Sequence, residues 1–380
     1  MAAGPERDAE TSKTKSAIES KTESVGKSTS RRRLLSATAV GSVTALAGCA
    51  KLLGHGDPLR VSIWSGNYAD RFEEGVVGRY EDEFETPIEI YPGWSNILTD
   101  IQTAPADDPP FDVTVAEGNF YYYGRQDDLF EPIRTENVPN AEEIIDFYRE
   151  MRNTEYGLPV DGAPCTIIHR EDGDVDPETW GDLSSAAIES SSGIGVDTGF
   201  WWYPLYAAAI GMDEEDGAEE MHDTAYHEDV LAQVADWNVQ SWASSGEDIW
   251  QAFENGVIDA AQWYYDQTAY DIQDYDGLTH TMPEQTTGWL NNWCVVRGTD
   301  KRDEAEQFIN FLLDSDVQST WSESHPMVFS NENIEYASGL EEDLPTTTEE
   351  AQNIAFPDWE FLSEHNATLS DEFTSIQQRS

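Results

Sequence analysis

Two tryptophans and a glutamate stand where three predicted strands end. Trp64 closes an alternating stretch, Glu117 follows an apolar run, and Trp263 closes another. In α/β sheets, ligand sites lie beyond the carboxyl ends of the strands. An indole face attracts an organic cation, and a carboxylate forms a charge-assisted hydrogen bond with an ammonium group. These positions therefore predict a ligand site, at which such side chains could hold a small cation.

The spacing of apolar residues predicts the elements that hold this site. Alternation marks strands, and apolar residues three and four apart mark helices. The expected strands span residues 59–64, 87–91, 111–116, 194–196 and 258–263. The expected helices lie near residues 72–84, 97–101, 205–210, 230–237, 249–254 and 304–312. Strands alternating with helices predict an α/β fold with a largely parallel sheet.

The amino-terminal residues have the features of an export signal. Residues 1–30 form a polar tail, and residues 31–49 begin with three arginines, continue with a short apolar run and end in Leu-Ala-Gly-Cys. This pattern predicts a twin-arginine signal. The ending resembles a lipobox, which implies lipidation of Cys49 and anchoring on the extracellular face of the cell membrane. Residues 50–58 are expected to be a linker.

The chain is strongly acidic, with 75 Asp and Glu against 21 Lys and Arg in 380 residues and a formal net charge of −54. Residues 1–48 hold eight basic and five acidic residues, which leaves 13 basic and 70 acidic residues from Cys49 onward. This charge argues against nucleic-acid partners. A hydrophobic content of 39% with 13 Trp predicts a folded chain. The composition indicates a very salty milieu, where the screening length falls to about 3 Å at 1 M salt.

Two cysteines remain beyond the export signal, Cys165 and Cys294. They could form a disulfide in an oxidising exterior, or they could be two small buried thiols. We favour the buried thiols.

Several blocks of sequence carry a family resemblance. They are Trp-Ser-Gly-Asn-Tyr at 64–68 with Arg-Tyr-Glu-Asp-Glu-Phe at 79–84, Phe-Asp-Val-Thr-Val at 111–115 with Leu-Phe-Glu-Pro-Ile at 129–133, Pro-Glu-Thr-Trp-Gly-Asp-Leu at 177–183, and Gly-Trp-Leu-Asn-Asn-Trp at 288–293 with Phe-Ile-Asn-Phe-Leu-Leu at 308–313. In this order they resemble polyamine-type substrate-binding proteins of ABC importers, within family 1 of the extracellular solute-binding proteins. The resemblance covers most of residues 59–335.

The resemblance implies a two-lobed periplasmic-binding-protein fold of type II, with a ligand cleft between lobes joined by crossing strands. Lobe 1 is expected to comprise residues 59–164 plus 294–333, and lobe 2 residues 165–293 plus 334–380. The expected partners are a small cationic ligand and an ABC permease. We expect a monomer that needs no cofactor and has no enzymatic activity.

The resemblance also implies the residues around the ligand. They are Trp64, Ser65, Tyr68, Glu117, Asn119, Thr198, Trp201, Trp263, Tyr264, Asp266, Trp289 and Asn291. This sequence departs from the polyamine binders in two places. Asn291 replaces their aspartate, and the turn 197–202 lacks the carboxylate pair of their second lobe, although Asp197 remains nearby. Each buried ammonium group of a polyamine needs an anion. An aromatic box instead suits a single diffuse cation such as choline or betaine. Both ligand classes stay open at this point.

The sequence also contains features of other functions. The adjacent Tyr264 and Tyr265 invite a ferric-iron site, and tryptophans with carboxylates also suit a sugar-binding receptor. The sequence contains no Gly-x-Ser-x-Gly elbow, no His-Glu-x-x-His and no phosphate loop. A secreted glycosidase is the least favoured reading, although the abundant carboxylates keep it open.

Overall fold

The computed structural model describes residues 56–173, 176–184 and 193–379. The polar tail, the predicted export signal and Cys49 lie outside the described residues. Among those described, no helix is long and apolar enough to cross a membrane.

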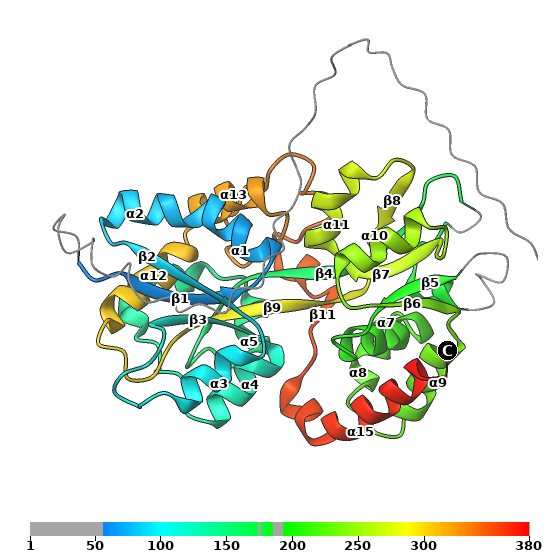
Figure 1. The fold of residues 1–380 in the computed structure, drawn as a ribbon, viewed down its shortest axis with the longest axis horizontal. Coiled ribbons are helices and arrows are strands. Elements are labelled where there is room, and N and C mark those ends of the chain that lie inside the picture. The colour runs from blue at the N-terminus through cyan, green and yellow to red at the C-terminus, as the bar shows by residue number, and fades with distance from the viewer. Residues whose placement is uncertain (1–55, 174–175, 185–192, 380) are drawn as a thin grey trace, which may run out of the picture. The chain divides into compact units, whose positions relative to one another are not determined.

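Eleven strands form one sheet, in the order β2-β1-β3-β9-β4-β7-β5-β6 (Figure 1). Strand β10 and strand β8 also pair with β4, and β11 pairs with β9. The strands are β1 Leu59–Trp64, β2 Ile88–Gly93, β3 Val113–Glu117, β4 Leu158–Arg170, β5 Ile194–Asp197, β6 Val239–Ala243, β7 Ala260–Tyr264, β8 Leu278–Thr281, β9 Thr286–Val295, β10 Val328–Phe329 and β11 Ile354–Ala355.

The prediction of a largely parallel sheet holds at the two ends only. Strands β2, β1 and β3 are parallel, as are β6, β5 and β7. Between them, β9 runs antiparallel to β3 and β4, and β4 runs antiparallel to β7. The rhythm of local strands and helices could not reveal these long-range pairings, because each joins segments that are far apart in the sequence.

Helices connect and cover the strands. They are α1 Asn67–Phe72, α2 Gly78–Phe84, α3 Asn96–Thr103, α4 Gly118–Gln126, α5 Asp146–Met151, α7 Trp202–Met212, α8 Gly217–Glu220, α9 His227–Asp236, α10 Gly246–Glu254, α11 Tyr265–Asp271, α12 Arg302–Leu312, α13 Ser315–Ser324, α14 Thr348–Ala351 and α15 Trp359–Gln377. The single predicted helix at 72–84 is interrupted by a π-helical segment, Glu73–Val77. Side chains cap several helix starts, as where Asp358 accepts a hydrogen bond from the Glu360 amide of α15.

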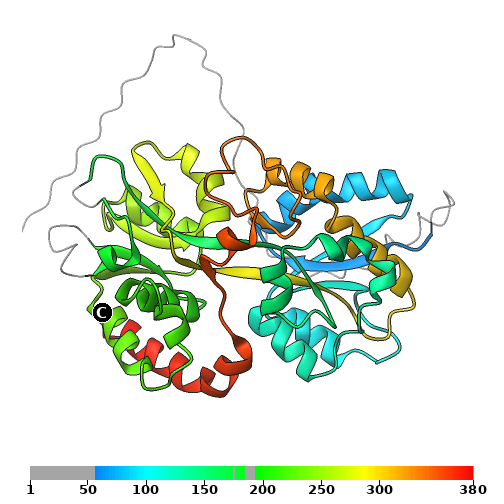
Figure 2. The same ribbon diagram turned by 180° about the vertical axis from the view of Figure 1, so that it is seen from behind.

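Two separate hydrophobic clusters define two lobes. The first packs around β1 and β3, and the second packs around β5 and β7. Strands β4 and β9 pair side by side and run between the two groups of elements (Figures 1 and 2). The first half of β4 contributes Leu158 and Val160 to the first cluster, and its second half contributes Ile167 and Ile168 to the second. The predicted α/β fold of two lobes joined by crossing strands is confirmed.

The packing differs from the predicted lobe boundaries in two places. Leu290 and Trp293 of β9 belong to the first cluster, although the sequence assigns them to lobe 2. The segment that contains Leu344 and Ile354 also contributes buried side chains to the first cluster. A crossing strand has no sequence signal that marks where it leaves one core for the other.

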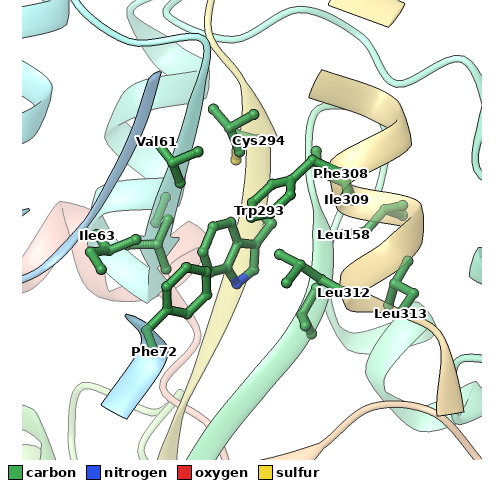
Figure 3. Packing of buried hydrophobic residues seen from close by; sticks show 14 of the residues in the cluster. Val61, Ile63, Phe72, Leu158, Trp293, Cys294, Phe308, Ile309, Leu312 and Leu313 are labelled. Carbon is green, nitrogen blue, oxygen red and sulfur yellow. The ribbon is translucent and has the colours of Figure 1, made fainter. Parts of the chain in front are cut away.

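Trp293 lies at the centre of the first cluster. Figure 3 shows its indole beside Phe72 and Phe308, with Val61 and Leu312 nearby. Its ring stacks on Phe72 at a centroid distance of 5.3 Å and meets Phe308 edge to face at 5.9 Å. The indole is fully buried, and its Nε1 donates a hydrogen bond to Asp161. A hydrogen bond therefore joins the centre of the first cluster to the buried carboxylate of Asp161.

The two described cysteines are free thiols, as favoured from the sequence. Both are fully buried, Cys165 in the second cluster and Cys294 in the first. Burial raises the pKa of both thiols well above the usual range, so both behave as small apolar side chains.

Candidate ligand-binding site

Three strands bring together the polar residues at the centre of the site. In the antiparallel register of β3 with β9, Glu117 lies opposite Asn291. In the register of β9 with β4, Asn291 lies opposite Asp161. Glu117, Asn291 and Asp161 thus form a row across the sheet, although they are far apart in the sequence.

An aromatic pocket lies beside this row. Eight of its eleven lining residues are aromatic, and the cavity has a volume of about 110 Å³. The lining residues are Trp64, Tyr68, Trp94, Glu117, Phe120, Phe200, Tyr203, Tyr264, Asp266, Gln267 and Trp289. Residues of both lobes take part, as predicted for a cleft between lobes. This volume is below the roughly 300–1,000 Å³ of pockets for drug-sized ligands, so the pocket suits a compact ligand.

Trp64 is the last residue of β1 and forms one wall. The parallel register of β1 with β2 places Trp64 opposite Gly93, the last residue of β2. Trp94 follows Gly93 directly and therefore lies at the same edge of the sheet as Trp64. The two indoles stack with centroids 5.5 Å apart and planes 15° apart. Phe120 meets the Trp64 ring edge to face at 5.1 Å. The faces of such rings attract cations.

Asn291 and Asp161 hold the aromatic wall from behind. Asn291 accepts a hydrogen bond from Trp64 Nε1 at 2.9 Å through its Oδ1 and donates to Asp161 Oδ2 at 2.7 Å. Tyr68 also donates its hydroxyl to Asp161 Oδ2, at 2.9 Å. With Trp293 as a further donor, Asp161 accepts three hydrogen bonds. Burial raises the pKa of Asp161 to about 6, and the three donors oppose that shift.

Glu117 is the anion of the pocket. It ends β3 and immediately precedes α4, yet its side chain does not cap the helix. Instead, its Oε1 accepts a hydrogen bond from the Tyr203 hydroxyl at 3.1 Å. Burial raises the pKa of Glu117 to about 7, although Arg152 and the Tyr203 hydroxyl favour the charged form. A cationic ligand would favour that charged form further.

Asp266 supplies a second carboxylate from α11. The residue is buried, and its Oδ1 has no hydrogen-bond partner in the described part of the chain. Its Oδ2 lies 3.5 Å from His325 Nε2. Its backbone carbonyl accepts a hydrogen bond from Arg71, which in turn stacks on Tyr270. A buried acceptor without a donor at a cavity wall suits an ammonium group or a hydroxyl of a ligand.

Asp197 organises the wall from the second lobe. This buried residue ends β5, and its Oδ2 accepts a hydrogen bond from the Tyr264 hydroxyl at 2.6 Å. It also accepts the backbone amides of Gly199 and Phe200, which fixes the turn after the strand. Tyr264 and Tyr203 meet edge to face at 5.5 Å. Asp197 is therefore a carboxylate that orients aromatic side chains, with its own oxygens already occupied.

The structure brings most of the predicted site residues together. Six line the aromatic pocket: Trp64, Tyr68, Glu117, Tyr264, Asp266 and Trp289. Ser65 and Trp263 line an adjoining cavity of about 770 Å³ that shares Tyr68, Trp94, Phe200, Tyr264, Asp266 and Gln267 with the pocket. Asn291 lies behind the pocket, where it holds Trp64.

Three predicted site residues lie elsewhere. The Thr198 hydroxyl accepts a hydrogen bond from Gln377 at the end of α15, at 2.6 Å. Trp201 is buried in the second cluster against Trp202 and Trp359, so it belongs to the core. Asn119 lies in the first turn of α4 and lines neither cavity. In each case the residue lies near a strand end but does not line the pocket.

Sequence reasoning missed six residues of this site: Trp94, Asp161, Phe120, Phe200, Tyr203 and Gln267. The strand-end rule could have found Trp94, because it directly follows β2 at the same sheet edge as Trp64. Asp161 carried no signal, because it lies inside a buried strand with no local pattern to mark it.

The adjacent tyrosines Tyr264 and Tyr265, which the sequence offered as a ferric-iron site, diverge in the structure. Tyr265 donates a hydrogen bond to Asp343, while Tyr264 donates one to Asp197. They do not converge as two ligands of one metal ion would.

The sequence profile of the bacterial extracellular solute-binding proteins matches residues 67–345. This match spans most of the chain, and the chain belongs to that family. No curated protein sequence matches it.

Solved structures share the fold. An ABC transporter protein from Clostridium perfringens has a TM-score of 0.66 at 20% identity, covering 84% of this chain and 99% of that one. The spermidine/putrescine ABC transporter substrate-binding protein PotD from Streptococcus pneumoniae has a TM-score of 0.68 at 15% identity, covering 84% and 98%. A binding protein, AgtB, from A. tumefaciens, solved with agropinic acid, has a TM-score of 0.65 at 18% identity, covering 84% and 98%. At these identities the likeness concerns the fold.

Proposed function

We propose that this chain is the substrate-binding component of an ABC importer and that it captures a compact organic cation, of the quaternary ammonium class, in the aromatic pocket. The observation that carries the proposal is the composition of the pocket, with eight aromatic residues and two carboxylates around about 110 Å³. Cation–π contacts contribute roughly 0.5–2 kcal/mol each, so several rings can hold one diffuse cation. Glu117 supplies the compensating charge.

A second candidate is a polyamine. Glu117 lies on β3 and Asp266 on α11, so the pocket offers carboxylates from two separate elements to two ammonium groups. The adjoining cavity of about 770 Å³ offers room for a longer chain. The likeness to PotD, which is named for spermidine and putrescine, supports this candidate at the level of the fold.

Titration calorimetry in molar salt tests the proposal, with choline, betaine, putrescine and spermidine as ligands and a neutral disaccharide as control. We expect choline or betaine to bind most tightly, because a methylated ammonium needs aromatic faces more than separate anions. Tighter binding of putrescine or spermidine would support the second candidate. Silence from all four amines would refute the cationic ligand, and heat from the disaccharide alone would favour a sugar receptor.

The affinity for choline is expected to depend on pH through Glu117. Its pKa is raised to about 7 by burial, so the carboxyl is mostly protonated at pH 6 and mostly charged at pH 8. Choline keeps its charge throughout, so affinity should rise about tenfold from pH 6 to pH 8 as the anion forms. Calorimetric titrations at a series of pH values would show this rise. An affinity that stays flat, or falls, over this range would exclude Glu117 as the anionic partner.

We further propose that the chain is exported as a folded protein and anchored through a lipid on Cys49. The arginines at 31–33 and the Leu-Ala-Gly-Cys ending support this proposal. A Cys49→Ala variant expressed in a halophilic host is expected to lose its lipid, detected by intact-mass analysis of the membrane fraction. A native protein whose mass includes no lipid would contradict the anchor.

A further inference from the structure

A second cavity, of about 400 Å³, lies away from the aromatic pocket and carries arginines. Its walls include residues of α4, of α5 and of the segment just after α5 in the first lobe, residues of α7 and α8 in the second, and residues between 352 and 360. Two consecutive residues line the two cavities. Glu117 lines the aromatic pocket, and Gly118, the first residue of α4, lines this one. We call it the arginine cavity, after Arg125 and Arg152.

Arg152 differs from most basic side chains in the described part of the chain. Most of the others form ion pairs with carboxylates. These are Arg60, Arg71, Arg125, Arg134, Arg149, Arg170, Lys301 and Arg302. Among the described residues, Arg152 has no ion pair within 4.0 Å, and its Nη2 is buried without a hydrogen-bond partner. The residue as a whole is half-buried. A buried guanidinium nitrogen without an acceptor is costly, and acids outnumber bases about five to one beyond residue 48.

Two further hydrogen-bond donors of the same cavity lack acceptors. Arg125 Nε and Trp359 Nε1 are buried, and neither has a partner in the described residues. Gly118 allows the close approach of these groups, because a Cβ on residue 118 would lie 3.0 Å from Trp359 Nε1 and 3.7 Å from Arg152 Nη1. Three buried donor atoms without acceptors therefore border one cavity, although Arg125 also pairs with Glu360 through another nitrogen. An acceptor from outside the chain would satisfy them.

The surroundings limit the charge of that acceptor. Glu215, Glu219, Asp358 and Glu360 also border the cavity, and all four are exposed. These carboxylates would repel a dianion more strongly than a monoanion. The walls also include apolar side chains, Phe147, Met151 and Phe356, which could contact the carbon atoms of an organic acid.

We propose that the arginine cavity is a binding site for a monovalent anion, held by the guanidinium of Arg152 with Arg125 and Trp359 as further donors. The anion has two possible sources, a halide of the surrounding salt or the carboxylate of a small organic acid. Both would accept charge-assisted hydrogen bonds from Arg152. This site shares no lining residue with the aromatic pocket, although Arg152 is close enough to Glu117 to favour its charged form.

Anomalous diffraction tests the site with the native protein. Crystals are grown in sodium bromide in one arm and with 4-bromobenzoate in the other, both in potassium sulfate without chloride. A bromine peak in the arginine cavity with bromide would identify a halide site. A bromobenzoate whose carboxylate contacts Arg152, without a bromide peak, would identify an organic acid site. No anomalous peak in the cavity in either arm would overturn the proposal.

Calorimetry in the same sulfate buffer separates a specific site from adventitious binding. The anion that gives the peak is titrated into the native protein, an Arg152→Gln variant and an Arg149→Gln variant. Arg149 is the matched control, because it is near in sequence, pairs with Asp146 and does not line the cavity. We expect affinity to fall at least about tenfold in Arg152→Gln only, because this variant loses a charge-assisted hydrogen bond to the anion. Equal affinities in all three proteins would overturn the role of Arg152.

Discussion

A Glu117→Gln variant is expected to bind choline at least about 30-fold more weakly than the native protein at pH 8. Glutamine keeps the shape of the side chain and can still accept the Tyr203 hydrogen bond. The variant therefore removes mainly the charge that faces the cation. Loss of one member of a buried charge pair costs about 2 kcal/mol or more, which corresponds to the stated change in affinity. Calorimetric titration of both proteins would measure it.

The control for this variant is Glu83→Gln, which removes an exposed carboxylate of α2 that does not line the pocket. Its choline affinity should match that of the native protein. The pH dependence should also disappear in Glu117→Gln and persist in Glu83→Gln. Equal losses of affinity in both variants would mean that the overall negative charge attracts choline, and that Glu117 has no particular role.

The strand ends of the site could be predicted from the sequence because they follow a local rule. The predicted and observed first strand coincide at Leu59–Trp64, and Glu117 ends β3 one residue beyond the predicted stretch. Apolar alternation fixes such positions without any knowledge of distant residues. Trp64 and Glu117 were therefore placed correctly at the sheet edge from the sequence alone.

Side-chain direction after a strand end could not be predicted in the same way. Residues 197–203 form a turn and the start of α7, and within it Phe200 and Tyr203 face the pocket while Trp201 enters the core. The difference depends on Asp197, which accepts amide hydrogen bonds from this turn. The Asp197 carboxylate is held in turn by the Tyr264 hydroxyl of another strand. The aromatic sequence alone does not distinguish the two faces of this turn.

The replacement of the polyamine binders' aspartate by Asn291 has a structural counterpart one strand away. Asn291 donates to Asp161, a buried carboxylate that no sequence pattern marked. The oxygens of Asp161 already accept hydrogen bonds from Tyr68, Asn291 and Trp293. A carboxylate therefore remains near this position, but it fixes aromatic walls and is not among the residues lining the pocket. This arrangement favours a site with many rings and few free anions, as the proposed function requires.

A Trp293→Ala variant is expected to lose about 4 kcal/mol of unfolding free energy. Removal of a fully buried tryptophan leaves a cavity beside Phe72 and Phe308, and such substitutions typically cost about 3–5 kcal/mol. The change also removes one of the three hydrogen-bond donors to Asp161, whose buried carboxylate is then less satisfied. Chemical unfolding in molar salt, followed by circular dichroism, would measure the loss.

Two matched variants separate the causes of this loss. Trp293→Phe keeps an aromatic ring in the core but cannot donate to Asp161, so it should lose about 1–3 kcal/mol. Trp94→Ala removes an indole that is 49% exposed, and it should change stability by no more than about 1 kcal/mol while weakening choline binding. If Trp293→Ala and Trp94→Ala were equally stable, the first cluster would not depend on Trp293. Reduced choline affinity in Trp293→Phe would show that the hydrogen bond to Asp161 also positions the pocket wall, because Asp161 holds Tyr68 directly and Trp64 through Asn291.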